Sequence, residues 1–474
     1  MPRTKLALAA MTLAVLAGCG GTSPEPGNQT LRNKFSSQVV FGDSLSDVGT
    51  YAVGAVAALK GGKYTINGDN TSINPALTGK MWPELMAMQL GVSADCAAQT
   101  GLDGDASQGF SVPVVNHAGC YNYAQAGARV TNPVGYGNKL TGSPLGQLTV
   151  PVVGQIANHL KIVGGKFKGD EVVFVMAGGN DALLLTAQLT QDATAAGNAA
   201  GAAAGAAAGA TAFANSLVSQ LAAGATNPAT AAQAIGLALA TENANPNHTS
   251  QSLVGAAVAA AAVQPGDSAV ASPAVYGPMV AKATADATTA GNAAGQAAGA
   301  KAGADYAAAH GPDLVAAMAQ AATELAAAVK TQIVGNGANF VVVNNLPDVG
   351  TTPATLSQPA SAQALVNAMV AAFNNTLATA LAGQDHVLVV DVFATSHDEA
   401  TNPGPYGLTN VKDTACDLSP AKNPLGVSLT CNGSNLVAGD VSHYAFADTV
   451  HPTPFHHLLL ARYVAEKMVL KGWL

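Results

Sequence analysis

A serine at residue 44 stands where the chain could turn sharply from a buried strand into a helix. The apolar residues 39–41 predict the strand, and the small and apolar residues 48–59 predict the helix. Open α/β sheets bind ligands at the carboxyl ends of their strands, so Ser44 could be a nucleophile if a base reached it. Ser44 could also be a simple helix N-cap. The flanking Asp43 and Asp47 are interpreted as helix caps or as partners of the helix dipole.

The opposite end of the chain supplies a possible base. Asp448 stands three residues before His451, in a predicted turn ahead of a helical pattern over residues 455–470. A carboxylate this close can bind one imidazole nitrogen while the other nitrogen faces a serine that the fold brings near. Three nearby histidines are interpreted as structural or surface residues: His443, His456 and His457.

A third stretch ends in a side chain that could stabilise negative charge. The apolar residues 172–177 predict another buried strand, which two glycines and Asn180 follow. The side-chain amide of Asn180 could donate a hydrogen bond to an oxyanion. An asparagine in a turn after a strand is the simpler interpretation of this residue in isolation.

Together these motifs resemble those of the GDSL-type serine esterases and lipases of the SGNH hydrolase superfamily, whose marker residues are Ser, Gly, Asn and His. Residues 42–45 match the nucleophile block, 178–181 the asparagine block and 448–453 the histidine block. Residues 122–128 match the glycine block, with Gly127 as its marker. The four blocks occur in the order that is typical of the family.

The resemblance implies a three-layer α/β/α sandwich with a mostly parallel sheet and an acyl-enzyme mechanism without a metal ion or cofactor. Ser44 would attack a lipid or other acyl ester, His451 would be the base, and Asp448 would orient it. The oxyanion would be bound by the backbone amides of Ser44 and Gly127 and by the side chain of Asn180. An acyltransferase that uses the same acyl-enzyme, and a surface-anchored binding protein without catalysis, are the alternatives.

The composition of the 474-residue chain predicts a folded protein with one large core or two smaller ones. Hydrophobic residues make up 49% and charged residues 10%, with a formal net charge of -8 and no basic cluster, which argues against a nucleic-acid partner. Further strand patterns over 339–345 and 386–393 alternate with helical patterns over 313–334 and 362–381. This alternation is typical of a doubly wound, mostly parallel sheet.

Residues 1–18 resemble the signal peptide of a bacterial lipoprotein. A basic start precedes the apolar run 6–17, which is too short to span a bilayer, and small residues lead to Cys19. Lipidation of Cys19 would anchor the protein to a membrane, with residues 19–37 as a flexible tether. We therefore expect an exported protein of the cell envelope, lipid-anchored with the outer membrane as the expected location, or secreted. An ordinary secretory signal with a chance cysteine is the alternative.

Four further cysteines are expected to pair in an oxidising compartment. Pairing of nearest neighbours closes the shortest loops and is the arrangement we predict: Cys96 with Cys120, and Cys416 with Cys431. A metal site is the less favoured alternative because the spacings lack a C-x-x-C pair. Each loop precedes a block of the site, so the disulfides could help to fix Gly127 and His451.

A segment rich in alanine and glycine, residues 191–310, divides the predicted core into residues 38–190 and 311–474. Glycine recurs at every fourth position in two runs, 197–209 and 291–303. Glycines at this period lie along one face of a helix and allow close approach of another backbone, which predicts an antiparallel helical hairpin. A flexible insert is the alternative. The hairpin could be a lid, a docking surface for an apolar substrate, or structural decoration.

Overall fold

The computed structural model describes residues 32–68 and 79–474. Its central sheet has four parallel strands in the order β1-β4-β5-β6: β1 (Gln38–Gly42), β4 (Val172–Met176), β5 (Phe340–Asn344) and β6 (Val387–Val390). The strands are rich in valine and almost entirely buried, as expected for a parallel sheet with both faces covered. The predicted signal peptide, Cys19 and the tether up to residue 31 lie outside the described residues.

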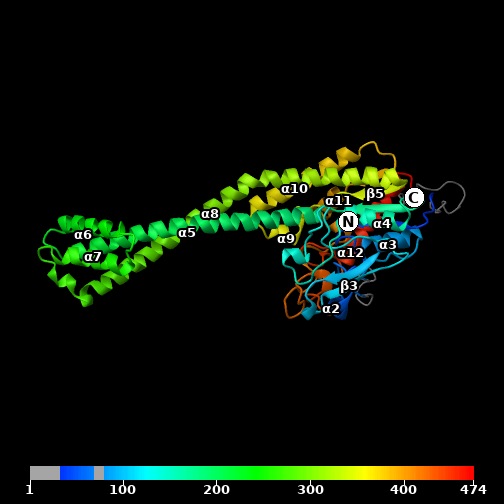
Figure 1. Ribbon diagram of the computed structural model, residues 1–474. Helices are drawn as coiled ribbons and strands as arrows, with labels where there is room; N and C mark the ends of the chain where they lie inside the picture. The colour runs from blue at the N-terminus through cyan, green and yellow to red at the C-terminus, as the bar shows by residue number, and fades with distance from the viewer. Residues whose placement is uncertain (1–31, 69–78) are drawn as a thin grey trace, which may run out of the picture.

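Helices cover both faces of this sheet. On one face, α3 (Trp82–Leu90) and α12 (Pro454–Leu470) pack against Val40, Phe174 and Val342. On the other face, α4 (Val152–Ile162), α10 (Ala360–Leu381) and the end of α8 (Pro273–Ala328) pack against Phe41 and Val175. Side chains alternate between the faces because successive residues of a strand point to opposite sides. The expected three-layer α/β/α fold is confirmed, and its layers are seen in Figure 1.

The shorter elements surround the layers. They are β2 (Gln99–Asp103), β3 (Ser111–Asn116), β7 (Asn410–Thr414), β8 (Tyr444–Phe446), α2 (Gly54–Ala58), α9 (Pro353–Leu356) and α11 (Val392–Thr401). β2 and β3 pair antiparallel, and β7 and β8 pair parallel. The predicted tether overlaps the core at its end: Asn33 donates a hydrogen bond to the carbonyl oxygen of Trp473, and Phe35 is buried in the cluster that includes side chains of α12.

α10 is long and apolar enough to cross a membrane by length and composition. Its apolar side chains, however, face the sheet: Met369, Phe373 and Leu377 are fully buried in the core. Core helices of folded proteins can also be this long and this apolar. The packing of α10 identifies it as a core helix.

The helix predicted over residues 48–59 is only partly present. α2 covers Gly54–Ala58 alone, and the chain before it forms turns. The carboxylate of Asp47 accepts hydrogen bonds from the backbone N–H of Gly49 and Thr50, as a helix N-cap would, but the chain does not continue as a helix. Gly49 and Gly54 also have φ values of 135° and 53°, a region that glycine adopts readily and that a right-handed helix excludes.

The alanine- and glycine-rich segment forms the predicted helical hairpin, although the boundaries 191 and 310 fall inside its helices. α5 (Gly179–Ala222) begins at the sheet and runs outward, and α8 returns antiparallel beside it (Figure 1). At 1.5 Å per residue the 44 residues of α5 extend about 66 Å. At the far end α6 (Pro228–Asn243) and α7 (Ser250–Ala262) complete a small helical bundle with a core of its own.

Glycines bring α5 and α8 into backbone contact. A methyl group on Gly197, Gly201 or Gly205 would lie 2.8, 2.8 or 2.9 Å from the carbonyl oxygen of the facing glycine. The facing residues are Gly299, Gly295 and Gly291. Close packing of the two backbones offsets the low helix propensity of glycine, which explains why the sequence repeats it at this period.

The bundle at the end of the hairpin is carried away from Asn180, where α5 begins (Figure 1). From Asn180 to Leu217, a core residue of the bundle, α5 rises about 55 Å. A lid would therefore need a large movement of the whole hairpin, and the lid role stays a prediction.

Gly201→Ala should lower the thermal midpoint of the helical signal, because the added methyl group would lie 2.8 Å from the carbonyl oxygen of Gly295 and force the helices apart. Gly236→Ala on α6 is the matched control, since no atom lies within 4 Å of its added methyl group. Alanine in place of glycine within a helix stabilises by about 0.5–1 kcal/mol, so this variant should melt higher. Circular dichroism of the full chain measures both. If both variants shifted the thermal midpoint in the same direction, the close packing of α5 against α8 at Gly201 would be contradicted.

Candidate active site

The two ends of the chain meet at Ser44 and His451. Ser44 follows β1 directly, and His451 lies in the turn between β8 and α12. The Ser44 Oγ is 2.9 Å from the Nε2 of His451, and the His451 Nδ1 is 2.9 Å from both carboxylate oxygens of Asp448. A carboxylate only accepts hydrogen bonds, so Nδ1 carries the hydrogen and Nε2 accepts from the Ser44 hydroxyl.

The turn that carries His451 is organised by the side chain of Asp448. Its Oδ1 accepts hydrogen bonds from the backbone N–H of Val450 and His451, and its Oδ2 accepts one from the N–H of Ser428. Burial by itself would raise the pKa of Asp448. The charge of protonated His451 and these hydrogen bonds outweigh burial and hold the pKa of Asp448 well below its ordinary value.

Two disulfides fix the segments around this turn and around β1, with the pairing expected from the sequence: Cys96–Cys120 and Cys416–Cys431. The loop between Cys416 and Cys431 contains Ser428, whose N–H binds Asp448. The other disulfide precedes residues 121–123, which hydrogen-bond with Val40 along the outer edge of β1, the side that does not face β4. The disulfides therefore constrain the neighbours of the site residues.

An aromatic ring supports the imidazole from the side. The ring of Tyr64 packs 4.5 Å from the ring of His451, centroid to centroid. The side-chain amide of Gln147 donates a hydrogen bond to the Tyr64 hydroxyl at 2.8 Å, and both residues are buried. Tyr64 thus restricts the rotation of His451, a contact that the sequence motifs did not indicate.

The loop of Gly127 is held beside Ser44 by side chains of the other blocks. The Oδ2 of Asp47 accepts a hydrogen bond from the N–H of Ala126, and the Nδ2 of Asn180 donates to the carbonyl oxygen of Ala128. Gly127 has a φ of 84°, and a methyl group on it would lie 2.0 Å from a neighbouring carbonyl oxygen, so only glycine fits. These bonds hold the loop of Gly127 next to Ser44 and Asn180.

The next residue of the asparagine block anchors the same loop. The carboxylate of Asp181 binds the Nε of Arg129 at 2.8 Å and the backbone N–H of Val130 at 3.1 Å.

In the described part of the chain, the backbone N–H groups of Ser44 and Gly127 have no hydrogen-bond acceptor. Free N–H groups at these two positions are what an oxyanion site requires.

The other histidines near His451 have different surroundings. His443 lies on the surface against Phe455. His457 is fully buried, neither of its ring nitrogens has a partner among the described residues, and burial lowers its pKa well below the ordinary value. His456 forms a buried pair with Glu399. None of these three side chains contacts Ser44.

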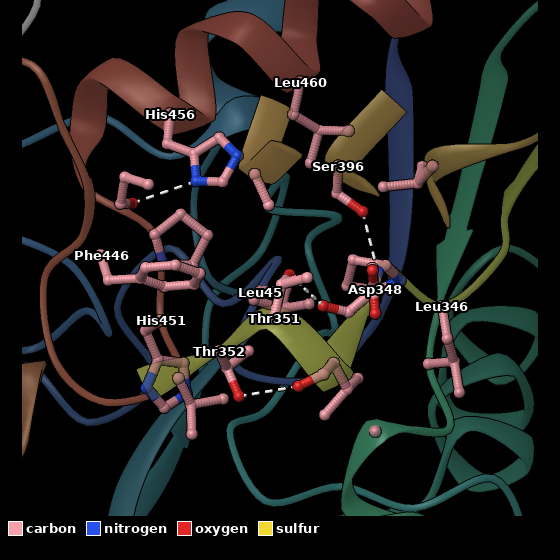
Figure 2. Close-up of a pocket in the computed structure, with 18 of the residues that line it drawn as sticks. Leu45, Leu346, Asp348, Thr351, Thr352, Ser396, Phe446, His451, His456 and Leu460 are labelled. Atoms are coloured by element: carbon pink, nitrogen blue, oxygen red, sulfur yellow. Dashed lines mark hydrogen bonds between the residues drawn. The ribbon is translucent and has the colours of Figure 1, made fainter. Parts of the chain in front are cut away.

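A cavity of about 110 Å³ opens beside Ser44 and His451 (Figure 2). Its walls are mainly apolar and come from the ends of several strands and from α11 and α12: Leu45, Leu346, Val392, Phe446 and Leu460 are among them. Asn180 and Asp43 line it as well. The contributions of α11 and α12 could not be found from the motifs, because these helices meet the cavity only through the fold.

Asp43, the residue directly before Ser44, has an unusual ionisation. Its Oδ1 accepts a hydrogen bond from the N–H of Leu45, which agrees with the turn or cap role expected from the sequence. Burial raises the pKa of Asp43 to about 7, against the opposing effects of the Leu45 N–H and the charge of His451. An unfolded aspartate has a pKa of 3.8, so the folded protein retains a proton there between these two values.

This ionisation predicts the pH dependence of an Asp43→Asn variant. The stability that Asp43 contributes is complete below the unfolded pKa and is lost as the pH rises through the folded pKa. The free energy of unfolding of Asp43→Asn, taken relative to that of wild type, should therefore be higher at about pH 8 than at about pH 5, by on the order of 1 kcal/mol or more. Urea unfolding at both pH values measures this, with Asp105→Asn, at an exposed carboxylate of lowered pKa, as the control. Parallel pH profiles for wild type and Asp43→Asn would contradict the shift.

The comparisons with known proteins agree with this site. The model of the GDSL-like lipase/acylhydrolase family matches residues 39–253 and 284–464, which together are most of the chain. The matched ranges contain Ser44, Asn180 and His451. A comparison with curated proteins found no match. The extent of the family match, together with the α/β/α fold, establishes that this chain belongs to the GDSL-like lipase/acylhydrolase family of hydrolases.

Proposed function

We propose that this protein is a serine esterase or lipase that hydrolyses carboxylic esters through an acyl-enzyme on Ser44. The observation that carries the proposal is the chain of contacts from the Ser44 hydroxyl to the His451 imidazole and on to the Asp448 carboxylate, each 2.9 Å long. His451 is the general base in this proposal, and Asp448 orients it. The family match supports acyl hydrolysis as the general reaction.

In the first half of the reaction, the Ser44 oxygen attacks the ester carbonyl while His451 takes its proton. The carbonyl oxygen becomes negatively charged and accepts hydrogen bonds from the N–H of Ser44, the N–H of Gly127 and the side-chain amide of Asn180. Loss of one such donor typically costs about 2.7–4 kcal/mol of transition-state stabilisation. His451 then gives its proton to the departing alcohol, and the acyl group remains on Ser44.

In the second half, His451 removes a proton from water, which attacks the acyl-enzyme and releases the acid. Asp448 stabilises the imidazolium that forms in each half, since its carboxylate is buried and bound to Nδ1. The apolar cavity beside Ser44 supports a substrate with an apolar portion, because burial of such a group is favourable.

We also propose that the protein is exported and held at a membrane by lipid on Cys19. The sequence of residues 1–19 supports this, as do the two disulfides, because disulfides persist in oxidising compartments. Phe35 is the first buried side chain after Cys19 among the described residues. A linker of about 15 residues would then join the lipid to the core and keep the active site accessible.

A fluorophosphonate probe should label wild-type protein at Ser44, because the phosphorus centre mimics an ester carbonyl and His451 activates the serine oxygen. Mass spectrometry of the peptide that contains Ser44 measures the label. Ser44→Ala should remain unlabelled and inactive on a panel of esters. Labelling of another serine, or none in folded wild-type protein, would contradict the proposal.

His451→Ala should lower kcat for a short soluble ester by about four orders of magnitude, since it removes the proposed base. His457→Ala is the matched control, because His457 lies six residues further along the chain, on α12, and is fully buried in the core. This second variant should lose stability and keep most of its activity in the folded fraction. Equal loss of kcat in both folded variants would argue against His451 as the base.

A further inference from the structure

A buried ion pair shares the cavity with Ser44. The Nε2 of His456 lies 2.8 Å from the Oε2 of Glu399, and its Nδ1 lies 3.0 Å from the carbonyl oxygen of Ala445. Both acceptors require a hydrogen on the nitrogen that faces them, so His456 is fully engaged within the protein. Glu399 and His456 both line the cavity.

The pair is separated from the proposed proton-transfer residues. In Figure 2 the ring of Phe446 lies between the imidazoles of His456 and His451. The Phe446 and His456 rings are 6.0 Å apart, centroid to centroid, and nearly perpendicular. Among the described residues, no hydrogen bond joins Glu399 or His456 to Ser44 or His451, so another explanation is needed for a charged pair at a mainly apolar cavity.

One oxygen of the pair remains available. Glu399 is only 4% exposed, and its Oε2 is occupied by His456. In the described ranges no donor binds the other carboxylate oxygen, Oε1. Oε1 does not belong to the fully buried polar atoms without a partner, so a donor that enters the cavity can reach it. If the pair only joined α11 to α12, Glu399 would not need to line the cavity.

A hydroxyl group lies beside this oxygen on the same helix. Thr395 precedes Glu399 by four residues on α11, so both side chains lie on one face, and both line the cavity. Thr395 is buried, and its hydroxyl can donate to the hydroxyl oxygen of Tyr406, which itself donates to Asp398. Together the two side chains form one polar part of a cavity whose walls are mainly apolar.

We propose that Glu399 determines substrate specificity by accepting a hydrogen bond from a hydroxyl group that the ester carries a few carbons from its carbonyl group. The apolar walls would take the intervening carbons, and Thr395 would complete this polar part of the cavity. The preferred substrates are then hydroxylated aliphatic esters. This inference rests on the proposed esterase function, and the hydroxyl group can belong to the acyl part or to the alcohol part.

Two pairs of esters show whether the hydroxyl group belongs to the acyl part or to the alcohol part. The acyl pair is the methyl ester of a short linear acid and the methyl ester of its ω-hydroxy derivative. The alcohol pair is the acetate of a short linear alcohol and the monoacetate of the corresponding diol. Wild-type enzyme should show a higher kcat/KM for the hydroxylated member of one pair, by about tenfold or more, and the pair that shows it identifies the source.

Variants of Glu399 test whether this residue is the cause. Glu399→Leu should reduce the preference by about ten- to hundredfold, because it removes the acceptor and keeps a side chain of similar size. Glu399→Gln should give an intermediate preference, since its amide oxygen accepts without a negative charge. Glu171→Gln is the matched control: Glu171 is also buried but lies at the start of β4, and the wild-type preference should remain.

The outcomes separate this inference from the proposed function. Wild-type enzyme that hydrolyses all these esters without preference for either hydroxylated member would overturn the inference and leave the esterase function intact. The same holds for a folded Glu399→Gln or Glu399→Leu variant that keeps the wild-type preference. Wild-type protein that hydrolyses none of the esters and is not labelled at Ser44 would overturn both.

Discussion

The contact between the Ser44 hydroxyl and the His451 imidazole joins residues that are 407 positions apart in the sequence. Such a contact demands a rigid frame, because an imidazole that moves by about 1 Å loses its alignment with the serine oxygen. The parallel sheet supplies this frame. β1 places Ser44 at the carboxyl edge of the sheet, and α12 packs on one face of the same sheet directly after the turn that carries His451. The remaining features of the site hold the side chains of Ser44 and His451 in this relative position.

Carboxylates in the site act mainly on the backbone. Asp47 binds the N–H of Ala126, Asp181 binds the N–H of Val130, and Asp448 binds the N–H of Ser428. Each bond joins a motif residue to a loop that is distant in sequence. A buried carboxylate is costly without partners, so several N–H donors on one side chain both stabilise it and fix the loop. This explains why the candidate active site contains more aspartates than the proposed reaction uses.

The sequence predicted the four strands of the central sheet, the disulfide pairs and the helical hairpin, because each is encoded by local pattern or spacing. The period-four glycines are the clearest case: Gly201 faces Gly295 across the hairpin as expected. The helix expected over residues 48–59 was wrong for its first half, since the φ values of 135° at Gly49 and 53° at Gly54 interrupt a right-handed helix. The polar part of the cavity at Glu399 could not be predicted, because nothing near Glu399 in sequence indicates that the fold will bring it to the cavity beside the serine.

The most direct test is a crystal structure of the protein after reaction with a phosphonate ester, which leaves a tetrahedral phosphorus on the serine. The account predicts a covalent bond to the Ser44 Oγ, with one phosphonate oxygen within hydrogen-bonding distance of the N–H groups of Ser44 and Gly127 and of the Asn180 amide, and with His451 still bound to Asp448. A phosphonate oxygen that points away from these three donors, or a bond to a different residue, would contradict it.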